Sequence, residues 1–358
     1  MRGTQEIILN ATAKNAGRLT SKIIEDIITD SNLIFHDTLD HICRINYSEV
    51  ALGKYLSEGG FNVVRQATNA DPLRSTCLSV GENAREESAK QYAIKYLSIS
   101  KVRKGKRFAR GSADLAIEAH FLASLDHLNI IKLRAITEGD IERNISKGTE
   151  GCFFLIMDQI DVTLRQKLYL WKYQSHDDLS HYLTRMKRKS MFETRLKIIQ
   201  QLASVLAYLH SKSIIYRDFK PDNIGLNKNG VLKLFDFGTA KELKLRNEHY
   251  DGTYNLTCIV GSYRYMAPEV ALLKRYNLSA DVYSFGVLSW QVLALHAPFE
   301  DLDSENSQGY ARDRLRPKID ARGKHSHWPK KIRLMLAKCW NDDMSKRPSC
   351  DEILTTVR

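Results

Sequence analysis

The residues best suited to chemistry lie in two segments of the chain's second half. Residues 216–223 read Tyr-Arg-Asp-Phe-Lys-Pro-Asp-Asn and carry Asp218, Lys220 and Asn223 close together. The triplet Asp236-Phe237-Gly238 begins eighteen residues after Asp218 and follows the strand-like run 232–235. Carboxylate oxygens are ligands that a hard cation such as Mg²⁺ prefers. Taken singly, however, an aspartate before an aromatic residue and a glycine is often only a turn.

Two further motifs share the chain with these segments. Ala93-Ile94-Lys95 lies on a predicted strand upstream, and Ala267-Pro268-Glu269 follows downstream. In this order the motifs resemble the signature set of the protein kinase family. The resemblance covers about residues 50–358 and implies an α+β, protein kinase-like two-lobed fold. The small lobe would be an antiparallel sheet with one main helix, the large lobe mostly helical, and ATP would lie between them.

The resemblance implies a role for each matching residue. Asp218 would accept or orient the proton of the substrate hydroxyl, and Lys220 would meet the γ-phosphate. Asn223 and Asp236 would hold Mg²⁺, which bridges the phosphates. Phosphoryl transfer requires in-line positioning and compensation of negative charge, with little covalent work by the protein.

The resemblance also implies an ATP site. Lys95 would grip the α- and β-phosphates, paired with a glutamate on the following helix. Glu118 lies on that predicted helix, although it also fits an ordinary exposed acid, and Asp114 is the rival. Further residues are expected to line the ATP site. A glycine-rich loop would contribute Leu56, Ser57, Gly59 and Asn62, and the roof would contain Val64 and Ala93. Met157 would be the gatekeeper, and the hinge would be the backbone of residues 158–160, which begins at Asp158 and ends at Ile160.

The glycine-rich loop departs from the family pattern. Ser57 and Asn62 stand where the first and third glycines usually occur, and only Gly59 is kept, with Gly60 beside it. Small side chains still let backbone N–H groups approach phosphates. A plain β-turn is the alternative interpretation of this segment.

Two other departures concern the large lobe. Gly225 falls where the family usually places an apolar residue beneath the adenine, and Leu226 is the candidate to compensate. Tyr216 replaces the usual histidine and keeps an aromatic ring at that position. The stretch 279–286, Cys339-Trp340 and Arg347-Pro348 resemble the tyrosine-kinase-like branch, whose members mostly phosphorylate Ser and Thr. Lys220 and the loop 261–266 also resemble Ser/Thr kinases.

The same resemblance implies supporting and regulatory residues. Asp281 would anchor the backbone of the catalytic loop, and Arg347 would pair with Glu269. Arg217 beside the catalytic aspartate is typical of kinases whose activation loop is ordered by phosphorylation. The available hydroxyls are those of Thr253, Tyr254, Thr257 and Ser262, and our hypothesis is that Thr257 is an activating autophosphorylation site.

Hydrophobic patterning predicts the elements that position these residues. Strands are expected at 50–56, 61–67, 91–97, 130–136 and 153–157, with a long loop at 69–89. A helix capped by Ser112 follows, and the clearest helices are 196–210, 282–295 and 332–340. Residues 1–49 are predicted to form an extension, with a polar leader at 1–19 and a short amphipathic helix from Ser21. The kinase domain is expected at 50–358, with lobes at about 50–159 and about 160–358.

The net charge and its distribution limit the classes of partner that we expect. The 358 residues carry 54 Lys and Arg against 42 Asp and Glu, a net charge of +12 that favours anionic partners. The basic runs 101–107 and 185–189 are explained as solvated loops or as patches for nuclear import or nucleic acid. No stacking aromatic residues are interleaved with them, so we do not expect a nucleic-acid partner. Protein substrates with Ser or Thr acceptors are expected, with docking through the N-terminal helix or the insert 168–192.

The cysteine pattern and the hydropathy indicate the cellular compartment in which we expect the protein. The six cysteines form no CxxC pair, which favours a reducing cytosol over a disulfide-stapled secreted fold. Residues 282–299 lack charge but contain serine, glutamine, histidine and proline, so a buried helix explains them better than a membrane span. A cytoplasmic protein is expected, and the basic runs leave nuclear access open.

The sequence thus predicts an active Ser/Thr protein kinase that uses ATP and Mg²⁺. The alternative is a catalytically weak pseudokinase that acts as a scaffold. Ser57, Asn62 and Gly225 favour that alternative. The presence of all five residues expected to carry the chemistry opposes it: Lys95, Glu118, Asp218, Asn223 and Asp236.

Overall fold

The structure is a computed structural model that describes residues 2–29, 31, 33, 37–69, 91–98, 100–101, 105–174, 181–300, 313–323 and 325–358. Most of the predicted loop 69–89, part of the run 101–107 and the middle of the insert 168–192 lie outside the described residues. The chain divides into two compact units. Unit 1 comprises Met1–Gln159 and Asp236–Gly238, and unit 2 comprises Ile160–Phe235 and Thr239–Arg358.

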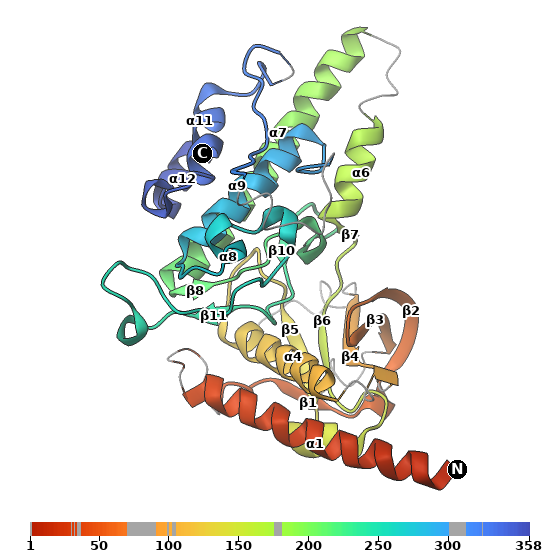
Figure 1. Ribbon diagram of the computed structural model, residues 1–358. Coiled ribbons are helices and arrows are strands. Elements are labelled where there is room, and N and C mark those ends of the chain that lie inside the picture. Colours follow the sequence, from red (N-terminus) through yellow and green to blue (C-terminus); the bar gives the residue numbers. More distant parts are fainter. Residues whose placement is uncertain are drawn as a thin grey trace. The chain divides into compact units, whose positions relative to one another are not determined.

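A sheet forms the core of unit 1. Its strands are β1 (Cys43–Ile45), β2 (Ala51–Glu58), β3 (Asn62–Asn69), β4 (Tyr92–Leu97), β5 (Leu133–Thr137) and β6 (Phe154–Asp158). In the described residues their order is β1-β5-β6-β4-β3-β2, and only the edge pair β1–β5 is parallel (Figure 1). Aromatic and β-branched residues suit such a half-buried surface, and Ile94, Phe154 and Ile156 are almost completely buried.

Helix α4 (Lys106–Ser124) carries the glutamate expected to face Lys95. The prediction that Ser112 caps this helix is wrong, because the helix begins at Lys106, after Gly105. The Ser112 hydroxyl instead donates to the Phe108 carbonyl oxygen within the helix. The buried positions Phe108, Leu115 and Leu122 repeat at helical spacing.

The N-terminal extension is also more helical than predicted. Helix α1 (Arg2–Thr29) includes most of the predicted polar leader and packs along α4 and α5 (Ile141–Lys147) (Figure 1). Thr20 donates to the Ala109 carbonyl oxygen at 3.2 Å. A Cβ at Gly17 would lie 2.7 Å from the Glu142 carbonyl oxygen, so glycine allows the close approach of α1 to α5. The sequence pattern missed this helix because alanine, glycine and threonine, rather than large apolar residues, form much of its buried stripe.

Unit 2 is mostly helical. Its helices are α6 (Leu164–Gln174), α7 (His181–Ser211), α8 (Pro268–Ala271), α9 (Ser279–Ala294), α11 (Lys330–Cys339) and α12 (Cys350–Val357). Two small sheets contain β7 (Val162–Thr163), β9 (Ile224–Leu226) and β10 (Leu232–Leu234), and β8 (Ile214–Ile215) with β11 (Lys241–Glu242). Single 3₁₀ turns in unit 2 are η3 (Pro221–Asn223), η4 (Leu245–Asn247), η5 (Tyr263–Tyr265) and η6 (Met344–Lys346). Unit 1 contains the 3₁₀ turn η1 (Tyr47–Glu49). The predicted α+β class is confirmed, although α7 begins at His181 rather than at 196.

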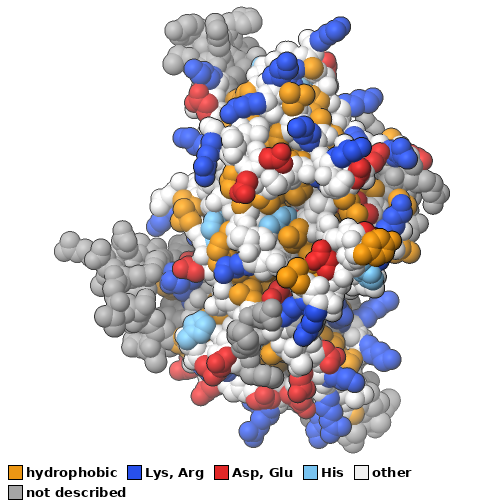
Figure 2. All heavy atoms as spheres, turned by 90° about the vertical axis from the view of Figure 1, so that its left-hand side faces the viewer, with side chains coloured by type: hydrophobic (Ala, Val, Ile, Leu, Met, Phe, Trp, Pro, Cys, Tyr) orange, Lys and Arg blue, Asp and Glu red, His pale blue; other side chains and the backbone are white. Residues whose placement is uncertain are grey.

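Helix α9 accounts for most of the uncharged run 282–299. It is buried along most of its length, and none of the helices in the described residues is long and apolar enough to cross a membrane. On the face drawn in Figure 2, Lys and Arg side chains are interleaved with Asp and Glu. Cys152, Cys258, Cys339 and Cys350 are free thiols.

Candidate active site

Lys95 on β4 lies between two carboxylates in unit 1. Its Nζ lies 2.5 Å from Glu118 Oε2 and 3.1 Å from Asp236 Oδ1. The rival Asp114 instead forms an ion pair with Arg110. Burial by itself lowers the pKa of Lys95, but the charges of Asp236 and Glu118 outweigh it and raise the pKa above its ordinary value. The lysine therefore stays positively charged at neutral pH.

The segment Asp236–Gly238 is held in unit 1 by backbone and aromatic contacts. The backbone N–H of Asp236 donates to Glu118 Oε1 at 3.1 Å, and the Phe237 ring packs against Phe121. Asp236 adopts a φ of 64°, a left-handed conformation that non-glycine residues rarely hold. Its side chain is 44% exposed, which leaves the carboxylate accessible to a cation.

The two oxygens of Asp218 in unit 2 have different surroundings. Oδ2 accepts hydrogen bonds from Lys220 Nζ at 2.6 Å and from Asn223 Nδ2 at 2.8 Å. Oδ1 is buried and accepts no hydrogen bond from any described residue. One oxygen is thus fixed, and the other is a buried acceptor with unused capacity.

Asp281 on α9 anchors the loop that carries Asp218. Its Oδ2 accepts from the backbone N–H of Tyr216 at 2.7 Å, and its Oδ1 accepts from that of Arg217 at 2.8 Å. These bonds fix Arg217 at a φ of 71°. The expected anchoring contact is therefore present, and Asp281 is completely buried.

Gly261 makes a close approach to the same loop that spacing alone did not reveal. It has a φ of 90°, and a Cβ there would lie 2.2 Å from the Arg217 carbonyl oxygen and 3.2 Å from Asp218 Oδ1. Both the torsion angle and the contact require glycine. The motif that signalled residues 261–266 gave no hint of this packing.

The expected roof of the ATP site lies on one face of the unit 1 sheet. Val64 is paired with Lys95, and Ala93 is paired with Met157. Paired residues, and residues two apart on a strand, point to the same face, so Val64, Ala93, Lys95 and Met157 share it. The Lys95 side chain extends toward α4, where its Nζ contacts Glu118.

The glycine-rich loop joins β2 and β3. Leu56 and Ser57 lie on β2, Asn62 begins β3, and the Gly59 N–H donates to the Asn62 carbonyl oxygen at 2.7 Å. Lys101, which the sequence placed in a basic connector, donates to the Gly59 carbonyl oxygen at 2.8 Å and thus holds the loop.

Phe61 fixes the other side of the same loop. Its ring packs against Phe108, and a Cβ at Gly111 would lie 2.4 Å from it. No local signal marks Gly111 as the glycine on which this aromatic residue rests, because the contact joins the loop to α4.

The predicted hinge residues differ in their contacts. The Asp158 carboxylate is occupied by Arg134 at 2.7 and 3.1 Å, so only its backbone remains for a ligand. In unit 2, the Ile160 side chain fills the space that a Cβ at Gly225 would take, at 2.6 Å. The expectation that Leu226 compensates for Gly225 is wrong, because neighbouring strand residues point to opposite faces.

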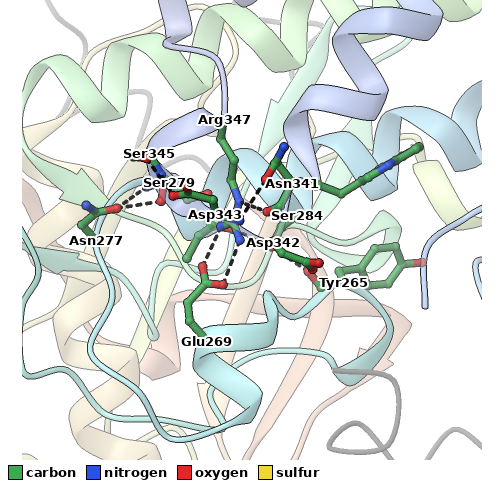
Figure 3. A network of polar contacts seen from close by, with 12 residues as sticks. Tyr265, Glu269, Asn277, Ser279, Ser284, Asn341, Asp342, Asp343, Ser345 and Arg347 are labelled. Atoms are coloured by element: carbon green, nitrogen blue, oxygen red, sulfur yellow. Dashed lines mark hydrogen bonds and ion pairs between the residues drawn. The ribbon is translucent and has the colours of Figure 1, made fainter. Parts of the chain in front are cut away.

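A buried ion pair joins Arg347 to Glu269 in unit 2 (Figure 3). Arg347 Nη1 and Nη2 donate to the two Glu269 oxygens at 2.6 and 2.8 Å, and Nη1 also donates to the Ser279 carbonyl oxygen. The expected pair is therefore present, with Arg347 completely buried at its side chain. Its role is structural.

The hydroxyls of the segment after Asp236 differ in accessibility. Thr253 is buried and donates to Asp251, and the Tyr254 hydroxyl donates to Glu248. Thr257 is exposed, whereas Ser262 is half-buried. The Tyr276 hydroxyl donates to the Thr257 carbonyl oxygen at 2.6 Å. Arg217, the predicted phosphate partner, keeps a buried Nη1 with no hydrogen-bond acceptor among the described residues.

Comparison with known proteins adds independent evidence. The sequence profile of the protein kinase domain matches residues 77–357. The serine/threonine-protein kinase VIK of Arabidopsis thaliana is 35% identical over 54% of this chain and 44% of its own length. The probable serine/threonine-protein kinase gdt4 of Dictyostelium discoideum is 24% identical over 98% of this chain and 19% of its own length. A putative mitogen-activated protein kinase kinase kinase 7-like protein of Drosophila melanogaster is 26% identical over 87% and 66%. The chain thus spans less than half of VIK and a fifth of gdt4.

Proposed function

Because the chain belongs to the protein kinase family, we propose that it transfers the γ-phosphate of ATP to serine and threonine hydroxyls of protein substrates. The observation that carries this proposal is the unused Oδ1 of Asp218, beside an Oδ2 fixed by Lys220 and Asn223. A buried carboxylate oxygen with spare capacity is suited to orient a hydroxyl and accept its proton. The names of the similar proteins in Arabidopsis and Dictyostelium support the Ser/Thr acceptor class.

The described residues fit ATP and Mg²⁺. Asp236 offers an accessible carboxylate, and Asn223 uses its Nδ2 as donor to Asp218, which leaves its amide oxygen as the ligand atom. Oxygen ligands of this kind suit Mg²⁺, which would neutralise phosphate charge when bound. Lys95, kept positive by its two carboxylates, would bind phosphate oxygens.

The decisive test is transfer of labelled γ-phosphate from Mg-ATP to the chain itself and to a generic Ser/Thr protein substrate. The parent should transfer phosphate, and Asp236→Asn should lose transfer. It should keep its fold, because Lys95 retains Glu118 as an ion-pair partner. Transfer that persists in Asp236→Asn would contradict the metal role.

The pseudokinase alternative rests on Ser57 and Asn62 in the glycine-rich loop. It predicts no transfer by the parent and no Mg²⁺-dependent rise of its melting temperature with ATP. A rise without transfer would support an enzyme that awaits activation. We also propose a cytoplasmic location, which fractionation of cells that express the chain would test.

Activation is proposed to depend on phosphorylation of Thr257. Its exposure, its contact with Tyr276 and the unpaired Nη1 of Arg217 support this choice over Thr253 and Tyr254. Phosphopeptide mapping of active protein should find Thr257 modified. Active protein in which Thr257 is always bare would remove the hypothesis.

A further inference from the structure

A cysteine, a histidine and an aspartate form a chain of contacts in unit 2 away from Asp218. Cys350 Sγ lies 3.2 Å from His210 Nδ1, and the other ring nitrogen, Nε2, lies 3.3 Å from Asp281 Oδ2. The three residues come from α12, α7 and α9, which pack together (Figure 1). Cys350 and His210 are 140 positions apart in the sequence, so no local sequence motif predicts the cluster.

His210 is protonated in this setting. Burial by itself lowers its pKa, but hydrogen bonds to Asp281 and Cys350 outweigh burial and raise the pKa to about 9. Both ring nitrogens of an imidazolium are donors, so Nε2–H donates to Asp281 and Nδ1–H donates to Cys350 Sγ. A sulfur beside a protonated imidazole is the arrangement in which cysteine nucleophiles react.

Two other features fit a reactive sulfur at this position. Cys350 is the first residue of α12, after the cap Ser349, and a helix N-terminus favours negative charge. Cys350 is also half-buried rather than sealed, whereas Cys339 is completely buried. Cys350 is therefore the more accessible of the two cysteines.

We propose that Cys350 is a redox-modification site whose oxidant is a hydroperoxide. The Cys350 sulfur, which loses its proton to solvent as it reacts, attacks the peroxide oxygen that carries hydrogen, so that an S–O bond forms and the O–O bond breaks. The sulfur loses two electrons, the peroxide gains them, and the product at Cys350 is a sulfenic acid. The leaving alkoxide or hydroxide takes a proton from the His210 imidazolium.

Oxidation would reach the catalytic loop through Asp281. The carboxylate that holds His210 also holds the backbone N–H groups of Tyr216 and Arg217. Conversion of the Cys350 sulfur to a sulfenic acid alters its contact with His210, and through His210 it would shift Asp281. This consequence rests on the proposed function, whereas the reactivity of Cys350 does not.

Cys258 is the matched control for reactivity. It is a free, half-buried thiol like Cys350, but among the described residues its Sγ donates to the carbonyl oxygens of Leu256 and Lys274, at 3.5 and 3.7 Å. An ordinary thiol is only about 3% thiolate at pH 7. Because the His210 imidazolium beside Cys350 Sγ favours negative charge on the sulfur as it reacts, we expect Cys350 to react about tenfold faster than Cys258.

The test treats the reduced full chain at pH 7 with limiting hydrogen peroxide and a dimedone probe, and site-resolved mass spectrometry follows each cysteine. Faster labelling of Cys350 than of Cys258 supports the proposal, and equal or slower labelling overturns it. His210→Gln should reduce the Cys350 rate to that of Cys258. The comparison within the parent stands even if that variant folds poorly.

A second arm measures phosphate transfer before peroxide, after peroxide and after a thiol reductant. The parent should lose and regain transfer, and Cys350→Ser should keep it throughout. Unchanged transfer in protein labelled at Cys350 overturns the coupling to the catalytic loop. Protein that is inactive before peroxide contradicts the proposed function, and the labelling ratio alone then decides the modification site.

Discussion

At the scale of single residues, the unequal surroundings of the two Asp218 oxygens make a sharp prediction. Asp218→Asn keeps the size of the side chain but removes the proposed proton acceptor, so kcat should fall by about 10²–10⁴-fold at an unchanged melting temperature. Asp222→Asn is the control, because the Asp222 carboxylate pairs with Arg165 at an exposed position and should leave transfer intact. A kcat within tenfold of the parent in Asp218→Asn would exclude Asp218 as the acceptor. Steady-state kinetics on both variants measures this.

His210 predicts how stability depends on pH. A group whose folded pKa is raised stabilises the fold fully below its unfolded pKa of about 6.5, and this contribution is lost as pH rises through its folded pKa, about 9. The free energy of unfolding of the parent relative to His210→Gln should therefore fall by about 3 kcal/mol between about pH 6 and about pH 9.5. The groups that contact His210 are the Asp281 carboxylate and the Cys350 sulfur. Urea unfolding at the two pH values measures the difference, and a relative stability that rises with pH would refute the assignment.

At the scale of elements, two glycines with positive φ allow the effect of a close contact to be distinguished from the effect of the torsion angle. Gly261 has both the positive φ and a close contact with the loop that carries Asp218. Gly230 also has a positive φ, 73°, but a Cβ there meets no atom within 4 Å. Gly230→Ala should cost about 1 kcal/mol of stability and keep transfer. Gly261→Ala should cost more and reduce kcat more than tenfold, because its Cβ displaces the Arg217 carbonyl. Chemical unfolding and kinetics on the pair measure both effects, and equal behaviour of the two variants would show that the contact is unimportant.

The pair of Arg347 and Glu269 gives the second prediction at this scale. Arg347→Met leaves a buried carboxylate without its partner, so the free energy of unfolding should drop by about 3–5 kcal/mol. Arg165→Met breaks an exposed pair and should cost less than about 1 kcal/mol. Denaturant midpoints of the two variants compare the pairs directly. Similar midpoints would mean that the buried pair contributes no more than the exposed one.

Elements also mark the limit of what the sequence predicts. Strands such as β4 and β6 are predictable because their apolar runs are short and bounded by polar breaks. The start of α4 was missed because Gly105 precedes a turn of basic residues with no capping side chain. Helix α1 was missed over residues 2–19 because its contacts with α4 and α5 use small residues, whose burial depends on a partner that no local window contains.

At the scale of the whole molecule, the residues predicted to do chemistry follow from short motifs that fix both type and order. Lys95, Asp218, Asn223 and Asp236 were identifiable in this way, and the contact of Lys95 with Glu118 is present. Contacts between segments that are distant in the sequence are not marked by any such motif. Ile160 over Gly225, Phe61 on Gly111 and Cys350 beside His210 each depend on packing between elements, which composition and spacing do not encode.

The return of residues 236–238 to unit 1 has a consequence for gene engineering. The chain passes from one unit to the other at 159–160, at 235–236 and at 238–239, so no single cut divides the gene into its two units. A fragment ending at Gln159 would keep Lys95 and Glu118 but lose Asp236, whose backbone and carboxylate complete their contacts. Separate production of unit 1 therefore requires a linker that grafts Asp236–Gly238 onto that fragment, and domain shuffling by simple truncation would dismantle its charged centre.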